Sequence, residues 1–210
     1  MRLIALFAGL LLFAVAIVSM LESGLGLPPW DVLHMGIAEH TPLTLGRAGV
    51  IVGLVIVAVA WIAGTLPGFG TIANAVVIGL VIDALSSVDA VARLSESPLV
   101  ARVGLLALGV WLFGVGSAFY IGAGMGAGPR DSLMLTLTRR TGWRIGLVRA
   151  SIEVTVLIIG LVLGGVAGIG TLTLALLVGP SVELSFWLLL RFGLADPRVR
   201  APEFGPLDAA

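Results

Sequence analysis

Two aspartates occupy matching positions in the two halves of the chain, and they are the first candidates for chemistry. Asp31 and Asp131 lie 100 residues apart, and each stands two residues after a proline and shortly after a glycine-rich run. The first turn of a helix tolerates proline, because its missing N–H has no helical partner there. A carboxylate in that turn interacts favourably with the helix dipole. The pattern therefore predicts two short helices that start at Pro29 and Pro129 and hold the aspartates in their first turns.

The neighbours of these aspartates differ between the halves, which predicts an asymmetric site. Arg130 stands where the first half has Trp30, and Tyr120 stands where it has Met20. His34 lies one helical turn after Asp31, and we interpret it as a surface or packing histidine rather than a proton relay. The candidate substrate-binding residues are Asp31, Trp30, Arg130, Asp131, Tyr120, Gly26 and Gly126.

Three further acidic residues lie inside or at the ends of apolar stretches. Glu153 is seven residues into the stretch that begins near Gly146, where an ionisable group marks a pathway or pairs with a neighbour such as Arg149. Asp83 and Glu183 are a matched pair near the ends of two apolar stretches. Proton coupling or cation coordination would suit this pair, and so would a simple position at the membrane interface.

The composition excludes several kinds of active site. The chain has no cysteine and no lysine, and it has two histidines. Disulfides, thiolate nucleophiles and a Schiff-base or P-loop lysine are therefore ruled out. The net charge of zero gives no nucleic-acid footprint. We expect no enzyme activity, no catalytic residues, no cofactor and no metal site.

The same composition predicts an integral membrane protein. Hydrophobic residues make up 59% of the 210 residues and charged residues 11%, and the mean hydropathy is +1.15. A bilayer crossing needs about 20 apolar residues in a helix. Six stretches meet this requirement, at residues 3–21, 46–64, 70–88, 102–121, 146–164 and 170–190.

The chain repeats itself at an offset of 100 residues without a gap. Polar and turn residues match in register, which composition alone does not produce: Pro29, Asp31, Thr41 and Thr71 meet Pro129, Asp131, Thr141 and Thr171. Fixed-offset similarity of this kind indicates duplication. We predict an all-α, polytopic protein with two tandem homologous repeats, residues 1–87 and 101–190, a linker at 88–100 and a polar tail at 191–210. Each repeat would hold three long helices and one short, interrupted helix.

The short helices leave two topologies open. A helix over residues 29–40 is too short to span the hydrocarbon core. If the glycine segment completes the crossing, each repeat has four passes and the repeats are parallel; if the short helix is re-entrant, each has three and the second is inverted. The positive-inside rule favours the parallel arrangement, because the inverted one places Arg47, Arg93 and Arg102 outside.

The glycine-rich breaks indicate the function. Non-helical backbone cannot face lipid, so residues 24–28 and 122–128 must be buried in protein or line a wet cavity. Interrupted segments at matching places in two halves indicate a transporter's substrate site, although the two aspartates could instead only cap their helices at the membrane surface. We expect a secondary transporter or exporter of a small solute. The alternative is a non-transporting accessory or scaffold protein of a membrane complex, and a homo-oligomer or a membrane partner protein is left open.

Two motifs carry a resemblance to a known family. With GLGLPPWDVLHMGI at 24–37 and GAGPRDSLMLTL at 126–137, the chain resembles the YczE branch of the YczE/YyaS/YitT group of bacterial membrane proteins. The resemblance implies a multi-pass protein of the bacterial inner membrane whose activity is poorly defined. Members are often suspected of transport and in some bacteria are linked to secondary metabolite production. The resemblance carries over no binding residues.

Overall fold

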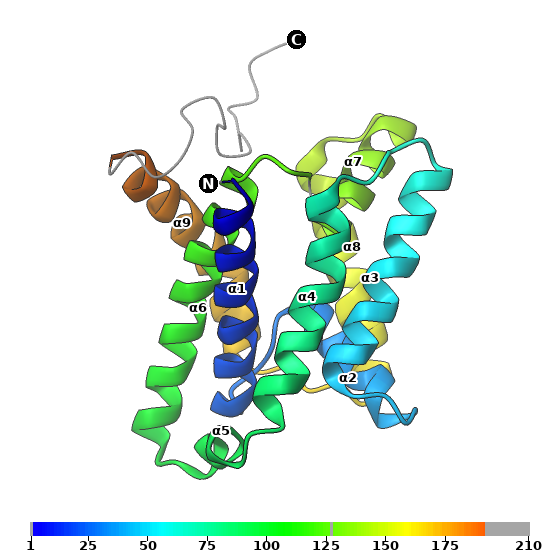
Figure 1. Cartoon of the computed structure of the whole chain (residues 1–210). Helices are drawn as coiled ribbons and strands as arrows, with labels where there is room; N and C mark the ends of the chain where they lie inside the picture. The colour runs from blue at the N-terminus through cyan, green and yellow to red at the C-terminus, as the bar shows by residue number, and fades with distance from the viewer. Residues whose placement is uncertain (1, 127, 192–210) are drawn as a thin grey trace.

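The computed structural model describes residues 2–126 and 128–191, and all regular elements in these ranges are helices (Figure 1). The long helices are α1 (Arg2–Ser23), α3 (Leu45–Ile62), α4 (Phe69–Ser86), α6 (Leu99–Gly122), α8 (Ile145–Val162) and α9 (Ile169–Arg191). The short ones are α2 (Pro29–Glu39) and α7 (Pro129–Thr141), and the linker forms α5 (Asp89–Ala92) and the 3-10 helix η1 (Arg93–Glu96). The expected polar tail, apart from Arg191, lies outside the described residues.

Glycines end the first long helix of each half. Gly24 and Gly26 have φ angles of 60° and 128°, and Gly124 and Gly126 have 63° and 126°. Side chains other than glycine rarely adopt positive φ, so these residues turn the chain where α1 and α6 stop. Proline at the first helical position then starts α2 and α7, as the sequence predicts.

Helices α1 and α6 lie side by side and run in opposite directions (Figure 1). Gly9 lies against Gly116 near one end of the pair, and Gly109 lies against Met20 near the other. Glycine at these places lets the two backbones approach closely. The rings of Phe13 and Phe113 pack between them with centroids 4.2 Å apart. In Figure 1 the N-terminus and the linker helix α5 accordingly lie at opposite ends of the bundle.

The short helices cross between the halves. Helix α2 packs on α8, and α7 packs on α3. Two reciprocal hydrogen bonds join each glycine-rich break to the turn before the last helix of the other half. The amide of Gly170 donates to the carbonyl oxygen of Leu25 at 2.7 Å, and the amide of Gly70 donates to that of Met125 at 2.8 Å. The breaks therefore satisfy backbone groups inside the protein, as apolar surroundings require.

The arrangement of the halves differs from the parallel topology that the arginines favoured. Helix α2 runs in the same direction as α8, because Leu33 lies against Gly160 and Gly36 against Leu163. The C-terminal ends of α1 and α2 both lie at the lower end of the bundle in Figure 1. The chain therefore turns back at the glycine-rich break, and α2 does not complete a fourth crossing. Corresponding helices α1 and α6 are antiparallel, which the parallel arrangement does not allow.

The predicted parallel topology was wrong because an arginine side chain can bind within the protein instead of marking the cytoplasmic side. Arg102 donates from Nε to the carbonyl oxygen of Ser23 at 2.7 Å and so satisfies the C-terminal end of α1. An arginine that is committed to a helix end is weak evidence for the side of the membrane on which it lies. The positive-inside rule counts such residues equally with free ones.

Several helices are long and apolar enough to cross a membrane. Among the described residues four helices meet this test, namely α1, α3, α4 and α6, and α9 makes a fifth if its two segments, bent by 47° near Pro180, form one span. The sequence predicted six. Large apolar side chains cover the outside of the bundle, such as Ile62 at 86% and Val162 at 81% exposure. These surfaces suit contact with lipid.

Candidate functional site

The N-terminal ends of α2 and α7 meet inside the bundle. Arg130, at the start of α7, places its guanidinium carbon 5.2 Å from the centre of the Trp30 ring, at the start of α2. The same guanidinium lies 3.8 Å from the carboxylate of Asp31. The structure thus brings together three of the residues that the sequence singled out, although Arg130 is separated from Trp30 and Asp31 by about a hundred positions in the chain. A cation over an aromatic face beside a carboxylate is a stabilising arrangement.

Asp31 is the most deeply buried charged residue of this cluster. Its side chain is 2% exposed. Its Oδ1 atom lies 3.1 Å from Nδ1 of His34, one turn further along α2. Its Oδ2 atom is buried and has no hydrogen-bond partner among the described residues. An unpaired carboxylate oxygen in such a place is energetically costly unless a donor is supplied.

Trp30 connects α2 to α8. Its indole N–H donates to Oε1 of Glu153 at 3.3 Å, and its ring packs with Ile56 and Val156. The carboxylate of Glu153 therefore belongs to the same cluster as Asp31, with Trp30 between them. The short helix of the first half holds an acidic group of the second half in place.

Tyr120 and Asp131 form a neighbouring pair in the second half. The Tyr120 hydroxyl donates to Oδ2 of Asp131 at 3.2 Å. Gly128 lies beside both residues and beside Asn74 of α4, and a Cβ there would be 3.4 Å from the Tyr120 hydroxyl oxygen. The Tyr120 side chain also lies within electrostatic range of Arg130. This pair adjoins the contact between α2 and α7.

The two glycine candidates shape the breaks and lie against the other half. A Cβ on Gly26 would come within 3.0 Å of Thr171, and one on Gly126 within 3.0 Å of Thr71. Oγ1 of Thr171 donates to the carbonyl oxygen of Leu27 at 2.7 Å. These glycines position α2 and α7, and the contacts of their backbones are with turns rather than with the charged cluster.

Asp83 and Glu183 lie apart from this cluster. Asp83 accepts hydrogen bonds from the amide of Gly46 at 2.9 Å and from the hydroxyl of Thr44, at the start of α3. This carboxylate satisfies free donors at a helix N-terminus. Glu183 is exposed on α9. The matched positions in sequence therefore have different surroundings in the fold.

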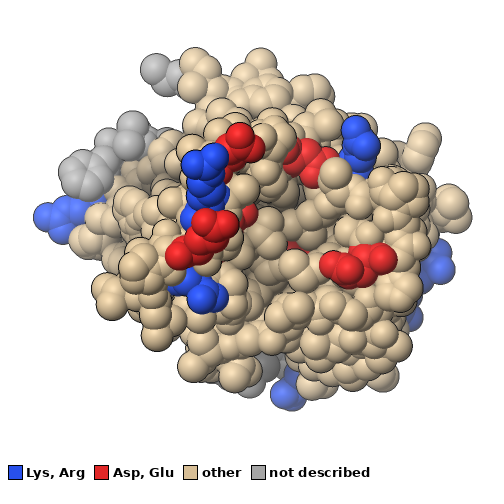
Figure 2. Space-filling view, turned by 90° about the horizontal axis from the view of Figure 1, so that it is seen from below, with Lys and Arg blue, Asp and Glu red and all other residues tan. Residues whose placement is uncertain are grey.

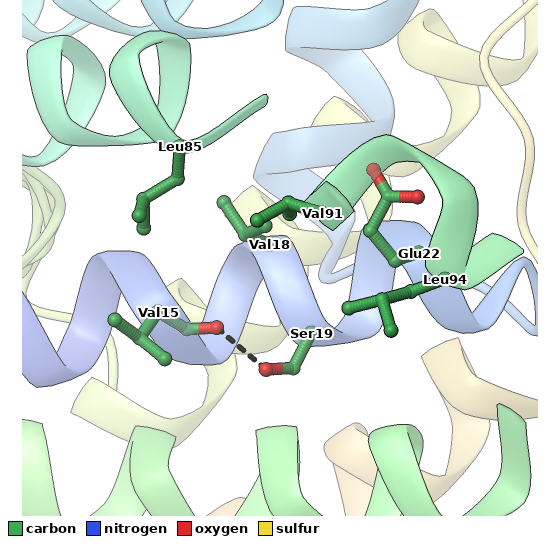
Figure 3. A pocket seen from close by; sticks show the side chains of 7 residues that line it. All are labelled: Val15, Val18, Ser19, Glu22, Leu85, Val91 and Leu94. Carbon is green, nitrogen blue, oxygen red and sulfur yellow. Dashed lines mark hydrogen bonds between the residues drawn. The ribbon is translucent and has the colours of Figure 1, made fainter. Parts of the chain in front are cut away.

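A cavity of about 150 Å³ lies elsewhere, between α1, α4 and the linker (Figure 3). Its lining consists of Val15, Val18, Ser19, Glu22, Leu85, Val91 and Leu94. Glu22 is 7% exposed and lines this cavity together with Val91 and Leu94 of the linker. The hydroxyl of Ser95 in η1 donates within the linker, to the carbonyl oxygen of Ala92 at 2.8 Å. Figure 2 shows this end of the bundle, where acidic and basic side chains lie near one another.

The sequence analysis does not select one of these buried polar residues, Glu22, although a carboxylate at the end of an apolar stretch with glycine at the matching position, Gly122, is a usable signal. His34 is 6% exposed and contacts Asp31, which agrees with a packing histidine and excludes a surface position. No group of three or more potential metal ligands is arranged to hold an ion within residues 2–126 and 128–191.

Comparisons with known proteins agree with the membrane fold. Residues 1–186 match the model of a family described as "Family of unknown function (DUF6198)". The chain is 37% identical to "Uncharacterized membrane protein YczE" of Bacillus subtilis (strain 168), over 90% of this chain and 83% of the relative. It is 33% identical to an "Uncharacterized protein" of Haemophilus influenzae, over 87% of this chain and 84% of the relative.

A more distant relative extends the comparison. The chain is 27% identical to "Uncharacterized protein YyaS" of Bacillus subtilis (strain 168), over 90% of this chain and 94% of the relative. The resemblance drawn from the two motifs is thus confirmed for YczE and YyaS. No solved structure matches the chain significantly. The relatives are bacterial, and together with the apolar helices they identify a multi-pass membrane protein.

Proposed function

Since the chain belongs to the DUF6198 family of unknown function, we propose its activity from the site: it is a secondary transporter or exporter of a small solute rather than an enzyme. The solute binds where α2 and α7 begin. The bacterial inner membrane is the proposed location.

One observation carries this proposal, namely the meeting of two short helices from different halves at a charged cluster in which Asp31 is buried and Arg130 is partly exposed. Arg130 of α7 contacts Trp30 and Asp31 of α2. Many transporters bind their substrate between two halves, at the ends of interrupted helices. Ionisable groups within the membrane are costly, and by default they mark a substrate or proton pathway.

We also propose that the two halves are homologous repeats related by inversion. Every helix of the first half has a counterpart displaced by about a hundred residues, for example α2 at Pro29–Glu39 and α7 at Pro129–Thr141. The φ angles at the breaks match within a few degrees. Antiparallel α1 and α6 support the inversion. Rocking of one half against the other would expose the cluster to each side in turn.

Six crossings follow from this proposal. Helices α1, α3 and α4 cross in the first half and α6, α8 and α9 in the second. The end of the bundle that holds the N-terminus carries more arginines, including Arg2, Arg139 and Arg140, and we assign it to the cytoplasm.

Flux measurements test the function. The purified protein is reconstituted into liposomes, and uptake of radiolabelled amines, amino acids, organic acids and sugars is measured. The comparison includes Asp31→Asn and a matched control, Glu183→Gln, which changes an exposed acid on α9. We expect uptake of at least one solute, about 10-fold slower with Asp31→Asn, because a charge-assisted contact contributes about 1.5–3 kcal/mol. The control should transport at the rate of the wild type.

The competing role as an accessory protein has a distinct outcome. If folded wild-type protein carries none of these solutes and a membrane protein co-purifies with it in stoichiometric amount, the transport proposal fails. The accessory or scaffold role would then be supported.

A further inference from the structure

The charged cluster at the start of α2 also indicates what kind of solute it receives. Resting on the transport function proposed above, we propose that the substrate carries an organic cation, an ammonium or guanidinium group. This cation binds the face of Trp30 and the carboxylate of Asp31, in the place that Arg130 occupies in this structure. Arg130 acts as a tethered competitor of the substrate.

The contact of Arg130 with Trp30 shows the chemistry of this place. The guanidinium carbon lies 5.2 Å from the centre of the ring, within the distance at which an aromatic face attracts a cation. The indole N–H is occupied by Glu153, which fixes the orientation of the ring. An aromatic face held beside carboxylates is suited to a flat or quaternary organic cation.

Asp31 supplies the second half of the recognition. One of its oxygens contacts His34 at 3.1 Å and lies 3.8 Å from Arg130. The other oxygen is buried and has no hydrogen-bond partner among the residues that the structure describes. A carboxylate accepts through both oxygens, and a buried one that lacks a donor is destabilising. An ammonium or guanidinium N–H would satisfy it.

The charges around the site favour a cation over an anion. Three carboxylates, those of Asp31, Asp131 and Glu153, outnumber the guanidinium groups of Arg130 and Arg149 in this region. An added positive charge therefore gains electrostatic energy, and an added negative charge loses it.

The start of α2 also lacks what an anion needs. Anions bind helix N-termini through free backbone N–H groups. Pro28 and Pro29 have no such group, and the amide of Asp31 already donates to the carbonyl oxygen of Pro28 at 2.9 Å. This helix end therefore presents few donors and one carboxylate.

Arg130 is placed so that it can leave. Its side chain is 30% exposed, whereas that of Asp31 is 2% exposed. A distance of 3.8 Å to the carboxylate is also longer than that of a charge-assisted hydrogen bond. Rotation of the Arg130 side chain towards its exposed side would uncover Trp30 and Asp31 together. The apparent affinity for a substrate cation is then proportional to the fraction of time that Arg130 leaves the site open.

Binding of a simple probe tests the proposal. Methylguanidinium is titrated into the purified, full-length protein in detergent, and the Kd is measured by calorimetry for wild type, Arg130→Ala, and each with Asp31→Asn added. We expect saturable binding to the wild type, about 10-fold tighter binding to Arg130→Ala, because the competitor is gone, and loss of binding with Asp31→Asn. Arg140→Ala, which removes an exposed arginine of the same helix, should bind as the wild type does.

Three results would overturn the proposal. Binding to Arg130→Ala without any to the wild type would mean that the probe only fills the space of the lost side chain. Binding that survives Asp31→Asn would place the probe elsewhere. Tighter binding of sulfate than of methylguanidinium would show that the site prefers an anion.

Trp30→Phe is a milder variant that controls for misfolding, because it keeps an aromatic face at this position. It should retain weakened binding of methylguanidinium.

The two proposals fail separately. If methylguanidinium does not bind but the uptake of another solute depends on Asp31, the substrate class is wrong and transport stands. If methylguanidinium binds as expected but no solute is carried, the cation site stands and transport is wrong.

Discussion

Thr171 of the second half donates a hydrogen bond from Oγ1 to the carbonyl oxygen of Leu27 in the first, at 2.7 Å. The bond crosses from the start of α9 to the break before α2. It is buried and ties the residue two positions before the Pro29 start of α2 to the other half. The position of Trp30 and Asp31 therefore depends on a contact between residues that are far apart in the chain.

Replacing Thr171 by valine should loosen this link. Valine has the same shape without the hydroxyl, so the buried carbonyl of Leu27 loses a donor, at a cost of about 1–3 kcal/mol of unfolding free energy. Thr171→Ser should restore most of the loss. Thr173→Val is the matched control, because that hydroxyl bonds within its own helix, to the carbonyl of Ile169. Unfolding in SDS, followed by circular dichroism, measures the difference; equal stability of Thr171→Val and wild type would contradict the role.

Gly79→Ala should destabilise the packing of α3 on α4. A Cβ on Gly79 would collide with the carbonyl oxygen of Gly46, so the helices must separate, at a cost of about 1–3 kcal/mol for overpacking. Gly104→Ala is the control within a helix, because a Cβ there meets no atom within 4 Å. It should be neutral or stabilising by up to about 1 kcal/mol through helix propensity. Thermal melts of both variants in one detergent check the prediction, which fails if the two behave alike.

Asp83→Ala should affect stability and leave the cation site unchanged. The substitution removes the acceptor for the amide of Gly46 and the hydroxyl of Thr44, and loss of such a helix cap costs about 0.5–2 kcal/mol. Glu183→Ala, at the matching position, should cost less than about 0.5 kcal/mol, because the side chain is exposed. Unfolding curves and the Kd for methylguanidinium are measured on the same samples. A weakened Kd in folded Asp83→Ala would connect Asp83 to the site.

The inverted arrangement predicts opposite accessibility of matching positions. The chain has no cysteine, so Thr41→Cys and Thr141→Cys each introduce a single thiol at an exposed residue. In sealed, oriented vesicles a membrane-impermeant maleimide should label the two from opposite sides. Parallel four-pass repeats would place both thiols on the same side. Labelling after detergent treatment shows that both thiols are reactive.

Local features of the sequence determined the helices and their interruptions. Apolar length fixed the long helices to within a few residues, and glycine followed by proline fixed where α2 and α7 begin. These features act within one or two turns, so the order of residues is enough to read them. The residues that match at an offset of 100 also predicted that the two breaks correspond to each other.

Only the tertiary structure decided which side chains meet. Arg130 over Trp30, the indole of Trp30 on Glu153, and the capping of α3 by Asp83 join residues that are between 37 and 123 positions apart. Such contacts depend on the direction in which each helix packs, and hydrophobic periodicity in an apolar bundle does not specify that direction. The parallel topology predicted from the arginines was wrong for the same reason, because Arg102 donates a hydrogen bond to the C-terminal end of α1. The sequence by itself determined where helices form, and the packing of the two halves against each other determined what their ends face.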